Sequence, residues 1–290
     1  MDLEIFLQVL INGLFSGGIY AVTAVGLTLI YGVMMIVNFA HGEFLMLGIY
    51  ISYFAFTLAG IDPYLSMPIS FITVFLIGAL IQRFIVQRVL NENGLNQVVL
   101  LVGVSTLIVG LMQFFAGADP RTIHVSYETK ALSFMGLRFS IPRMVAFFAS
   151  MIISFALYFF LQKTKTGKAI RAVSQNRTAA ALMGVDVKFI YILTFGIGTG
   201  ITAVAGSLLA PNNRMIPTIG TSYSVMTFVV VVLGTMGNFI GALVGGLIIG
   251  VVESFAGFYL GSDVKIIASM MIFILILLFK PSGLFGGKTK

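Results

Sequence analysis

Long apolar stretches, separated by short polar segments, follow one another along almost the whole chain. Eight of them approach or exceed the roughly 20 residues that a helix needs to cross the hydrocarbon core of a bilayer. They cover residues 5–31, 39–58, 64–86, 97–116, 142–162, 189–210, 222–258 and 264–279. This pattern predicts an all-α polytopic membrane protein.

The stretch 222–258 is too long for one ordinary span. Small and polar residues interrupt it at Gly234, Gly237 and Asn238. The interruption predicts either a broken helix or two tightly joined helices. The count of spans is therefore eight or nine.

Composition supports the same fold class. Of the 290 residues, 59% are hydrophobic and 9% are charged, whereas an ordinary soluble domain is about one-quarter charged. A folded monomer of this length has no interior large enough for so much apolar surface. A soluble enzyme is thus excluded. The absence of Cys and the presence of only 2 His exclude a disulfide scaffold and a zinc finger.

The net charge of +7 does not point to nucleic acid, because basic residues in a membrane protein concentrate in cytoplasmic loops. Three regions hold most of them: segment 163–188, the end of the third stretch and the C-terminal tail. Placing these regions in the cytoplasm puts eleven of the 17 basic residues inside. They are Lys163, Lys165, Lys168, Arg171, Arg177, Lys188, Arg83, Arg88, Lys280, Lys288 and Lys290.

Segments 59–63, 117–141 and 211–221 then face outward. The acidic N-terminus, with Asp2 and Glu4, also lies outside if the chain crosses nine times, which favours nine. The N-terminus lacks the basic start of a signal peptide, so we expect the first span to be retained. The longest polar stretches are too short to form a separate core. We therefore expect a single transmembrane domain over residues 1–290.

The chain contains 32 glycines, many of them four residues apart. Examples are Gly13 and Gly17, Gly196 and Gly200, Gly241 and Gly245, and Gly246 and Gly250. Small residues at this spacing let helix backbones approach closely in lipid. The spacing predicts a tightly packed, Gly-rich bundle.

Polar residues within apolar stretches are costly and are functional candidates. Asn38, His41, Gly42 and Glu43 lie together among apolar neighbours. On a continuous helix His41 and Glu43 would diverge by about 200°, and Gly42 suggests local unwinding between them. We interpret this group as part of a substrate pathway. The alternative is a polar turn at the cytoplasmic surface.

Glu253 is a second candidate for the substrate pathway. A carboxylate in this apolar stretch must be protonated, paired or hydrated. Arg143 or Lys265 could neutralise it from a helix end, or it could be a structural hydrogen-bonding residue between helices. Both chain halves also contain a stretch broken by Gly and Asn, at 38–42 and 234–238. Paired interruptions of this kind indicate the substrate path in transporters.

No catalytic, nucleotide-binding or metal-binding motif is present in the sequence. Segment 103–106 lacks the lysine of a phosphate-binding loop, and its apolar surroundings favour a packing role. His41, Glu43 and His124 make a poor metal set, so we expect no metal, no cofactor and no enzymatic activity. Uphill transport would then draw on an ion gradient or on a separate ATPase.

The basic segment 163–188 predicts a short helix over 169–183, because this part is Ala-rich and Gly184 follows it. Ile170, Val173, Ala180 and Leu182 give the helix an apolar contact surface. Such a helix is suited to docking a soluble subunit. The alternative is a membrane-surface helix held by anionic lipid.

Several motifs occur in the order found in one known family. Residues 26–33 (GLTLIYGV) and 37–48 (VNFAHGEFLMLG) resemble the signature of the branched-chain amino-acid ABC-transporter permeases. The ending 280–286 (KPSGLFG) and segment 167–185 are similar too. Within that segment the matching positions are Gly167, Arg171, Ala172, Asn176, Ala180 and Gly184. The resemblance covers almost the whole chain, and the form of 38–43 suggests the first of two permease subunits.

The resemblance implies a multi-subunit importer in the bacterial inner membrane. Its parts would be this chain, a second homologous permease subunit, two cytoplasmic ATP-binding subunits and a periplasmic or extracellular solute-binding protein. The matching residues of 167–184 would couple to the ATPases. The implied solutes are branched-chain amino acids, or urea and short amides. Departures at 90–94 and 233–237 weaken any assignment of the exact solute. An ion-coupled secondary transporter and a channel-like facilitator are the rival interpretations.

Overall fold

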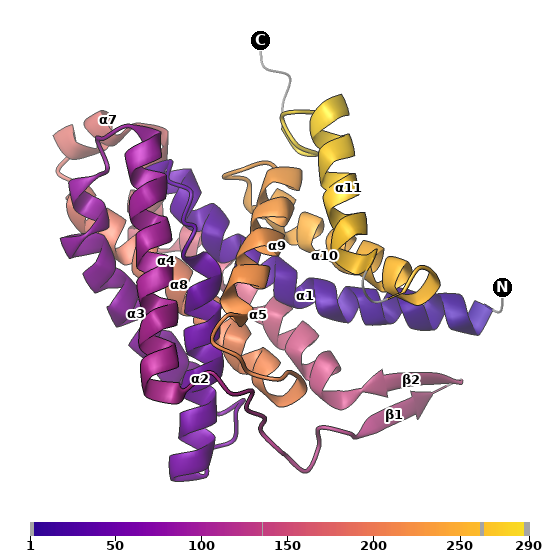
Figure 1. Ribbon diagram of the computed structural model, residues 1–290. Coiled ribbons are helices and arrows are strands. Elements are labelled where there is room, and N and C mark those ends of the chain that lie inside the picture. The colour runs from indigo at the N-terminus through magenta and orange to yellow at the C-terminus, as the bar shows by residue number, and fades with distance from the viewer. Residues whose placement is uncertain (1–2, 135, 262–263, 287–290) are drawn as a thin grey trace.

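The computed structural model describes residues 3–134, 136–261 and 264–286, and these fold into helices with one short β-hairpin (Figure 1). The helices are α1 (Leu3–Met34), α2 (His41–Ala59), α3 (Met67–Phe84), α4 (Gly94–Ala116), α5 (Ile141–Lys163), α6 (Lys165–Gln175), α7 (Arg177–Leu182), α8 (Val187–Leu209), α9 (Ile219–Leu233), α10 (Phe239–Tyr259) and α11 (Val264–Phe279). Short 3₁₀ turns lie at Val86–Arg88 and Ala210–Asn212. Strands β1 (Ala131–Phe134) and β2 (Leu137–Ser140) pair antiparallel, with Ala131 opposite Ser140.

Every apolar stretch predicted from the sequence forms helix. The stretch 222–258 forms two helices, α9 and α10, separated at 234–238. Seven helices in the described part of the chain are long and apolar enough to cross a membrane. The apolar helices α9 and α11 are shorter, with 15 and 16 residues. The all-α polytopic fold is thereby confirmed, with nine apolar helices in the described ranges.

Segments 59–63, 117–141 and 211–221 were predicted to share one side of the membrane, and they meet at one end of the molecule except for 219–221, which already belong to α9. We call this the hairpin end (59–63, 117–141 and 211–218). The Tyr127 hydroxyl donates hydrogen bonds of 3.0 and 2.8 Å to the two carboxylate oxygens of Asp62. Arg121 and Met215 pair through their backbones. Burial and the neighbouring Asp62 raise the pKa of Tyr127 well above its usual value, so its hydroxyl remains a donor at neutral pH.

The opposite end, which we call the α6 end (163–188, 233–238 and 280–286), holds the predicted cytoplasmic segment 163–188 and the first part of the predicted cytoplasmic tail, together with the break at 233–238. The Leu284 amide donates to the Leu233 carbonyl at 2.8 Å, so the chain finishes beside the end of α9. At the start of the chain, Gln8 bonds the Arg138 backbone in the hairpin end. The described part of the chain therefore begins at one end and finishes at the other. Asp2, Lys288 and Lys290 lie outside the described residues.

The packing centre is formed by α1, α8 and α10. In Figure 1, α1 runs across much of the molecule, and α11 and the β-hairpin stand at its periphery. α8 is the most buried candidate span. The predicted Gly pairs act in packing: Gly13 and Gly17 of α1 lie against α10, and Gly196 and Gly200 of α8 lie against phenylalanines of α3. Backbone contact with α10 explains the spacing of Gly13 and Gly17, and room for phenylalanine rings explains that of Gly196 and Gly200.

We expect Gly250→Ala to destabilise the protein markedly. A Cβ at Gly250 would lie 2.4 Å from backbone atoms of Gly17, which cannot move without shifting α1. Overpacking of this kind costs about 1–3 kcal/mol. Gly110→Ala is the matched control, because a Cβ there meets nothing within 4 Å. Thermal unfolding in detergent should show a lower midpoint for the first variant alone, and equal midpoints would refute the tight α1–α10 contact.

Candidate functional site

The predicted polar group 38–43 lies deep inside the molecule. Asn38, His41 and Glu43 are 2%, 1% and 1% exposed, so the alternative of a polar surface turn is wrong. Segment 35–40 connects α1 to α2 without helical structure, and Met35 adopts a positive φ of 57°. The Asn38 side-chain oxygen accepts from the Ala40 amide at 3.1 Å, whereas its Nδ2 has no partner among the described residues.

His41 fixes where α2 begins relative to α1. Its Nε2 lies 3.0 Å from the Thr23 carbonyl oxygen and 2.8 Å from the Thr202 hydroxyl of α8. A carbonyl only accepts, so Nε2 carries a proton and donates to it. Thr23 is eleven residues before the end of α1 at Met34, which corresponds to about 16 Å of helix. The chain therefore folds back beside α1 before α2 starts.

Glu43 points away from His41, toward other helices. Its Oε1 accepts hydrogen bonds from Ser105 of α4 at 3.1 Å and from Thr221 of α9 at 3.3 Å. Its Oε2 is buried and has no partner among the described residues. His41 and Glu43 therefore diverge as expected of positions two apart on a helix. His41 faces α1 and α8, and Glu43 faces α4 and α9.

The expected unwinding at Gly42 is wrong. Gly42 lies in the first helical turn of α2, and the non-helical backbone is confined to 35–40. Its lack of a side chain serves close packing instead, because a Cβ there would lie 2.0 Å from the Gly220 carbonyl oxygen. The Gly42 amide also donates to the Ser224 hydroxyl at 2.8 Å.

The first turns of α2 and α9 consequently lie side by side, and the two helices run in opposite directions. α2 leads to the hairpin end, where Asp62 bonds Tyr127, and α9 leads to the α6 end, where Leu233 bonds Leu284. Helix N-termini carry unpaired amides and partial positive charge. Glu43 lies at the contact of these two N-termini.

Glu253 lies on the other side of the start of α9. It is 8% exposed, and the Tyr20 hydroxyl donates to its Oε2 at 2.6 Å. The same carboxylate lines a cavity of about 400 Å³ together with Thr221 and Tyr223 of α9. Glu43 and Glu253 therefore do not form one cluster. The start of α9 separates them.

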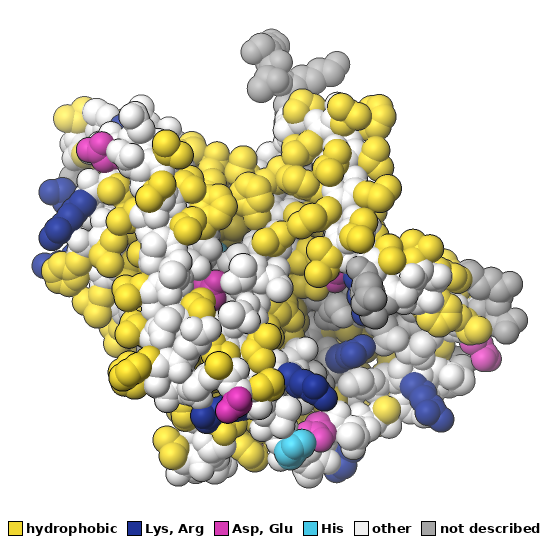
Figure 2. All heavy atoms as spheres, viewed as in Figure 1, with side chains coloured by type: hydrophobic (Ala, Val, Ile, Leu, Met, Phe, Trp, Pro, Cys, Tyr) yellow, Lys and Arg dark blue, Asp and Glu magenta, His cyan; other side chains and the backbone are white. Residues whose placement is uncertain are grey.

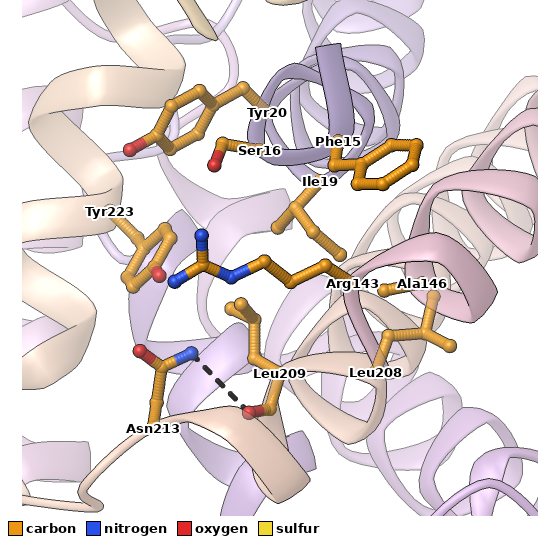
Figure 3. A pocket seen from close by; sticks show the side chains of 10 residues that line it. All are labelled: Phe15, Ser16, Ile19, Tyr20, Arg143, Ala146, Leu208, Leu209, Asn213 and Tyr223. Carbon is orange, nitrogen blue, oxygen red and sulfur yellow. Dashed lines mark hydrogen bonds between the residues drawn. The ribbon is translucent and has the colours of Figure 1, made fainter. Parts of the chain in front are cut away.

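A smaller cavity of about 120 Å³ adjoins this region (Figure 3). Arg143 extends from α5 between Ser16 and Tyr20 of α1 and Tyr223 of α9. The Asn213 side chain at the cavity edge donates to the Leu209 carbonyl oxygen at 3.3 Å. Arg143 and Lys265, which the sequence suggested as partners of Glu253, both line a third cavity with it, of about 300 Å³.

The second predicted break is built differently from the first. The Asn238 side chain caps α10 by accepting from the Gly241 amide at 2.9 Å. Gly237 has a φ of +83°, which favours glycine. Gly234 contacts Gly241 through their backbones, and a Cβ on either residue would overlap the other. The break lies at the α6 end rather than beside Glu43.

The basic segment forms two helices instead of the single helix predicted over 169–183. Thr164 caps α6 by accepting from the Gly167 amide at 2.9 Å, so helix begins before Ala169. Asn176 interrupts the chain with extended backbone and caps α7 through the Ala179 amide at 2.9 Å. The side-chain cap competes with continued helix. Gly184, with a φ of +85°, follows the end of α7.

The six residues of segment 167–185 that match the family motif divide into two groups by burial. Gly167 and Ala180 are buried, and Arg171 is half-buried with its guanidinium toward the Gln162 carbonyl oxygen. Ala172, Asn176 and Gly184 are exposed. Two apolar side chains that the resemblance did not select, Leu182 and Met183, are 83% and 85% exposed.

Other polar neighbours of the site were not selected from the sequence. Ser105 was assigned to packing, yet it bonds Glu43. The remaining ones are Thr23, Thr202, Thr221, Tyr20 and Tyr223. Their only sequence signal is a hydroxyl within an apolar stretch, which many structural residues share. Within the described ranges, no group of three His, Cys, Asp or Glu side chains could hold a metal ion.

Comparison with known proteins gives one consistent result. Residues 9–279 match the family described as branched-chain amino acid transport system permease component. The chain is 31% identical to the high-affinity branched-chain amino acid permease BraD of Pseudomonas aeruginosa, over 97% of this chain and 96% of that protein.

Two further relatives cover similar lengths. The LivH permease of Salmonella typhimurium is 32% identical over 97% of this chain and 96% of its own. The probable LivH permease of Methanocaldococcus jannaschii is 28% identical over 96% and 92%. No solved structure matches the chain.

Proposed function

Because the chain belongs to the branched-chain amino acid transport permease family, it is a multi-pass transport component, and we propose that its cargo is branched-chain amino acids. Residues 1–290 form its single transmembrane domain in this proposal. The membrane is the inner, cytoplasmic membrane of a bacterium. The bias of Lys and Arg places the α6 end in the cytoplasm and the hairpin end outside.

The complex consists of this chain, a second homologous permease subunit, two cytoplasmic ATP-binding subunits and an outer solute-binding protein. The chain has no phosphate-binding loop of its own, which is consistent with ATP hydrolysis by partners. Broad apolar surfaces on α3, α4, α5 and α11 supply faces for lipid and for the second permease subunit.

The ATPase-docking surface is formed by the outward side of α6 and α7. Ala172, Asn176, Leu182 and Met183 are exposed there. Ile170 and Val173 anchor α6 to the membrane helices, because both are buried. Gly167 allows that anchoring, since a Cβ there would lie 2.3 Å from the Phe160 carbonyl oxygen. Gly167, Arg171 and Ala180 thus position the surface, and Gly184 ends it. A force on the surface reaches α1 and α5 through these contacts.

The substrate pathway runs past Asn38, His41 and Glu43 and past Glu253. Three features support this assignment. These polar groups are buried in an apolar bundle, several of their atoms lack partners, and two helices begin beside Glu43. A passing zwitterion needs an acceptor for its ammonium and donors for its carboxylate. Carboxylates and helix N-terminal amides supply both. Gly42 and Gly220 keep the two helix starts close together.

The single observation that carries the function is the family match over residues 9–279. The test is reconstitution of the chain with the partner subunits from its own genome in proteoliposomes. We expect uptake of labelled leucine that needs ATP and the binding protein. Uptake driven by an ion gradient without ATPase subunits would favour a secondary transporter. ATP-driven uptake of urea or a short amide but not of leucine would overturn the proposed cargo.

A further inference from the structure

The three cavities described above surround one cluster of side chains between α1, α5, α9 and α10. Ser16 and Arg143 line the first and third cavities, Tyr20 and Tyr223 line the first and second, and Glu253 lines the second and third. The Tyr20 and Tyr223 rings are 6.2 Å apart. Figure 2 shows the molecule hollowed beneath α11, with basic and acidic side chains at the walls of the hollow.

Arg143 is a cation without an anionic partner in this cluster. Within residues 3–134, 136–261 and 264–286, it forms no ion pair and no hydrogen bond. Figure 3 shows its guanidinium directed into the cavity, with Ser16, Tyr20 and Tyr223 around it. A planar guanidinium with several free N–H groups is well suited to bind a carboxylate.

Glu253 provides the opposite charge in the same space. It shares the cavity of about 300 Å³ with Arg143. Tyr20 donates to its Oε2 and Ser269 of α11 also hydrogen-bonds the carboxylate, whereas a carboxylate has about four acceptor sites. Lys265 of α11 lines this cavity too, so an arriving ammonium shares the carboxylate with it.

The cavity of about 400 Å³ supplies an apolar compartment beside these charges. Val225 and Met226 of α9 and Ile266 and Met270 of α11 line it. Its size is within the range of small-molecule sites, which combine apolar walls with a few polar groups that orient the ligand. Methionine side chains adapt readily to aliphatic groups of different shape.

We propose that this cluster is a recognition site for a zwitterionic aliphatic α-amino acid on the hairpin-end side of the transport path. Arg143 binds the carboxylate, Glu253 binds the ammonium, and the apolar cavity receives the side chain. This inference rests on the proposed function and specifies where and how the cargo is first held by the permease. It also distinguishes the cargo chemically, because urea and short amides offer no carboxylate to Arg143.

The test uses the assembled transporter in lipid nanodiscs without the outer binding protein. The chain has no Cys, so Ser222→Cys places a single reporter thiol of this chain at the larger cavity, which Ser222 lines. The rate of maleimide labelling is measured with leucine, with isocaproate, which lacks the ammonium, and with isoamylamine, which lacks the carboxylate. We expect leucine to slow labelling and each analogue to need about a tenfold higher concentration for the same effect.

Charge variants then assign each contact. Arg143→Gln should raise the half-protecting leucine concentration about tenfold and leave protection by isoamylamine unchanged. Glu253→Gln should also raise the half-protecting leucine concentration about tenfold and should leave protection by isocaproate unchanged. Arg138→Gln is the matched control, because Arg138 is exposed at the same end and lines none of the three cavities.

Unchanged leucine protection in Arg143→Gln would overturn the site. Arg143 forms no ion pair or hydrogen bond with the described residues, so the Arg143→Gln variant remains informative even if Glu253→Gln fails to fold. ATP-driven leucine uptake by the complete transporter is measured alongside. Absence of that uptake refutes the proposed function, whereas normal uptake without any leucine protection refutes this site alone.

Discussion

Glu43→Gln is expected to lower leucine uptake by the assembled transporter about tenfold or more. The substitution keeps the side-chain volume but removes the negative charge beside the starts of α2 and α9. Charged hydrogen bonds contribute about 1.5–3 kcal/mol, and about 1.4 kcal/mol corresponds to a factor of ten. Uptake is measured in proteoliposomes with the binding protein present.

Glu92→Gln is the control for this prediction, because Glu92 is exposed at the loop between α3 and α4. Capture of leucine by the binding protein and co-purification of all subunits should be unchanged in both variants. His41→Ala should also reduce uptake, since it removes the bond to the Thr23 carbonyl oxygen. If the Glu43 and His41 variants both fail to assemble, the group is structural. If both assemble and transport normally, the pathway assignment is wrong.

The double substitution Leu182→Glu and Met183→Glu is expected to abolish solute-stimulated ATP hydrolysis. Both side chains are more than 80% exposed at the end of α7, so the chain itself should still fold. Two charges at the centre of an apolar contact leave unpaired, desolvated groups that oppose docking. The measurement is ATPase activity of the reconstituted complex with the binding protein and leucine.

The matched control replaces two exposed apolar residues at the opposite end, Leu132→Glu and Phe134→Glu in β1. Their exposed fractions are 51% and 67%, and the variant should retain its ATPase subunits on purification. Normal stimulated hydrolysis in the α7 variant would contradict docking there. If the ATPase activity of the α7 variant is normal but no longer depends on anionic lipid, then α6 and α7 form a membrane-surface element.

The hydrophobic pattern predicted the helices well because a bilayer imposes its own thickness on each span. The interruption at 234–238 could be predicted because Gly237 favours a left-handed turn and Asn238 favours a helix cap, whatever their surroundings. The division of the basic segment at Asn176 was missed. There, a side-chain cap and continued helix differ little in free energy, and the surroundings decide between them.

The roles of individual polar residues were harder to predict. Gly42 was interpreted as a point of unwinding, but its function in the fold is contact with Gly220, which lies on another helix. Ser105 was interpreted as a packing residue, yet it bonds Glu43. The contact of the Arg171 guanidinium with the Gln162 carbonyl oxygen was not predicted. In each case the deciding neighbour is distant in the sequence or lies on an adjacent element.

The sequence by itself determined the fold class, the positions of the apolar helices and the family. All of these depend on local composition, on spacing along one helix or on motif order. Only the tertiary structure decided which polar groups meet. Glu43 and Thr221 are 178 residues apart, and Tyr20 and Glu253 are 233 apart. Hydrophobic periodicity fixes which face of a helix is buried, but the partner of a buried polar atom depends on how the helices pack against one another.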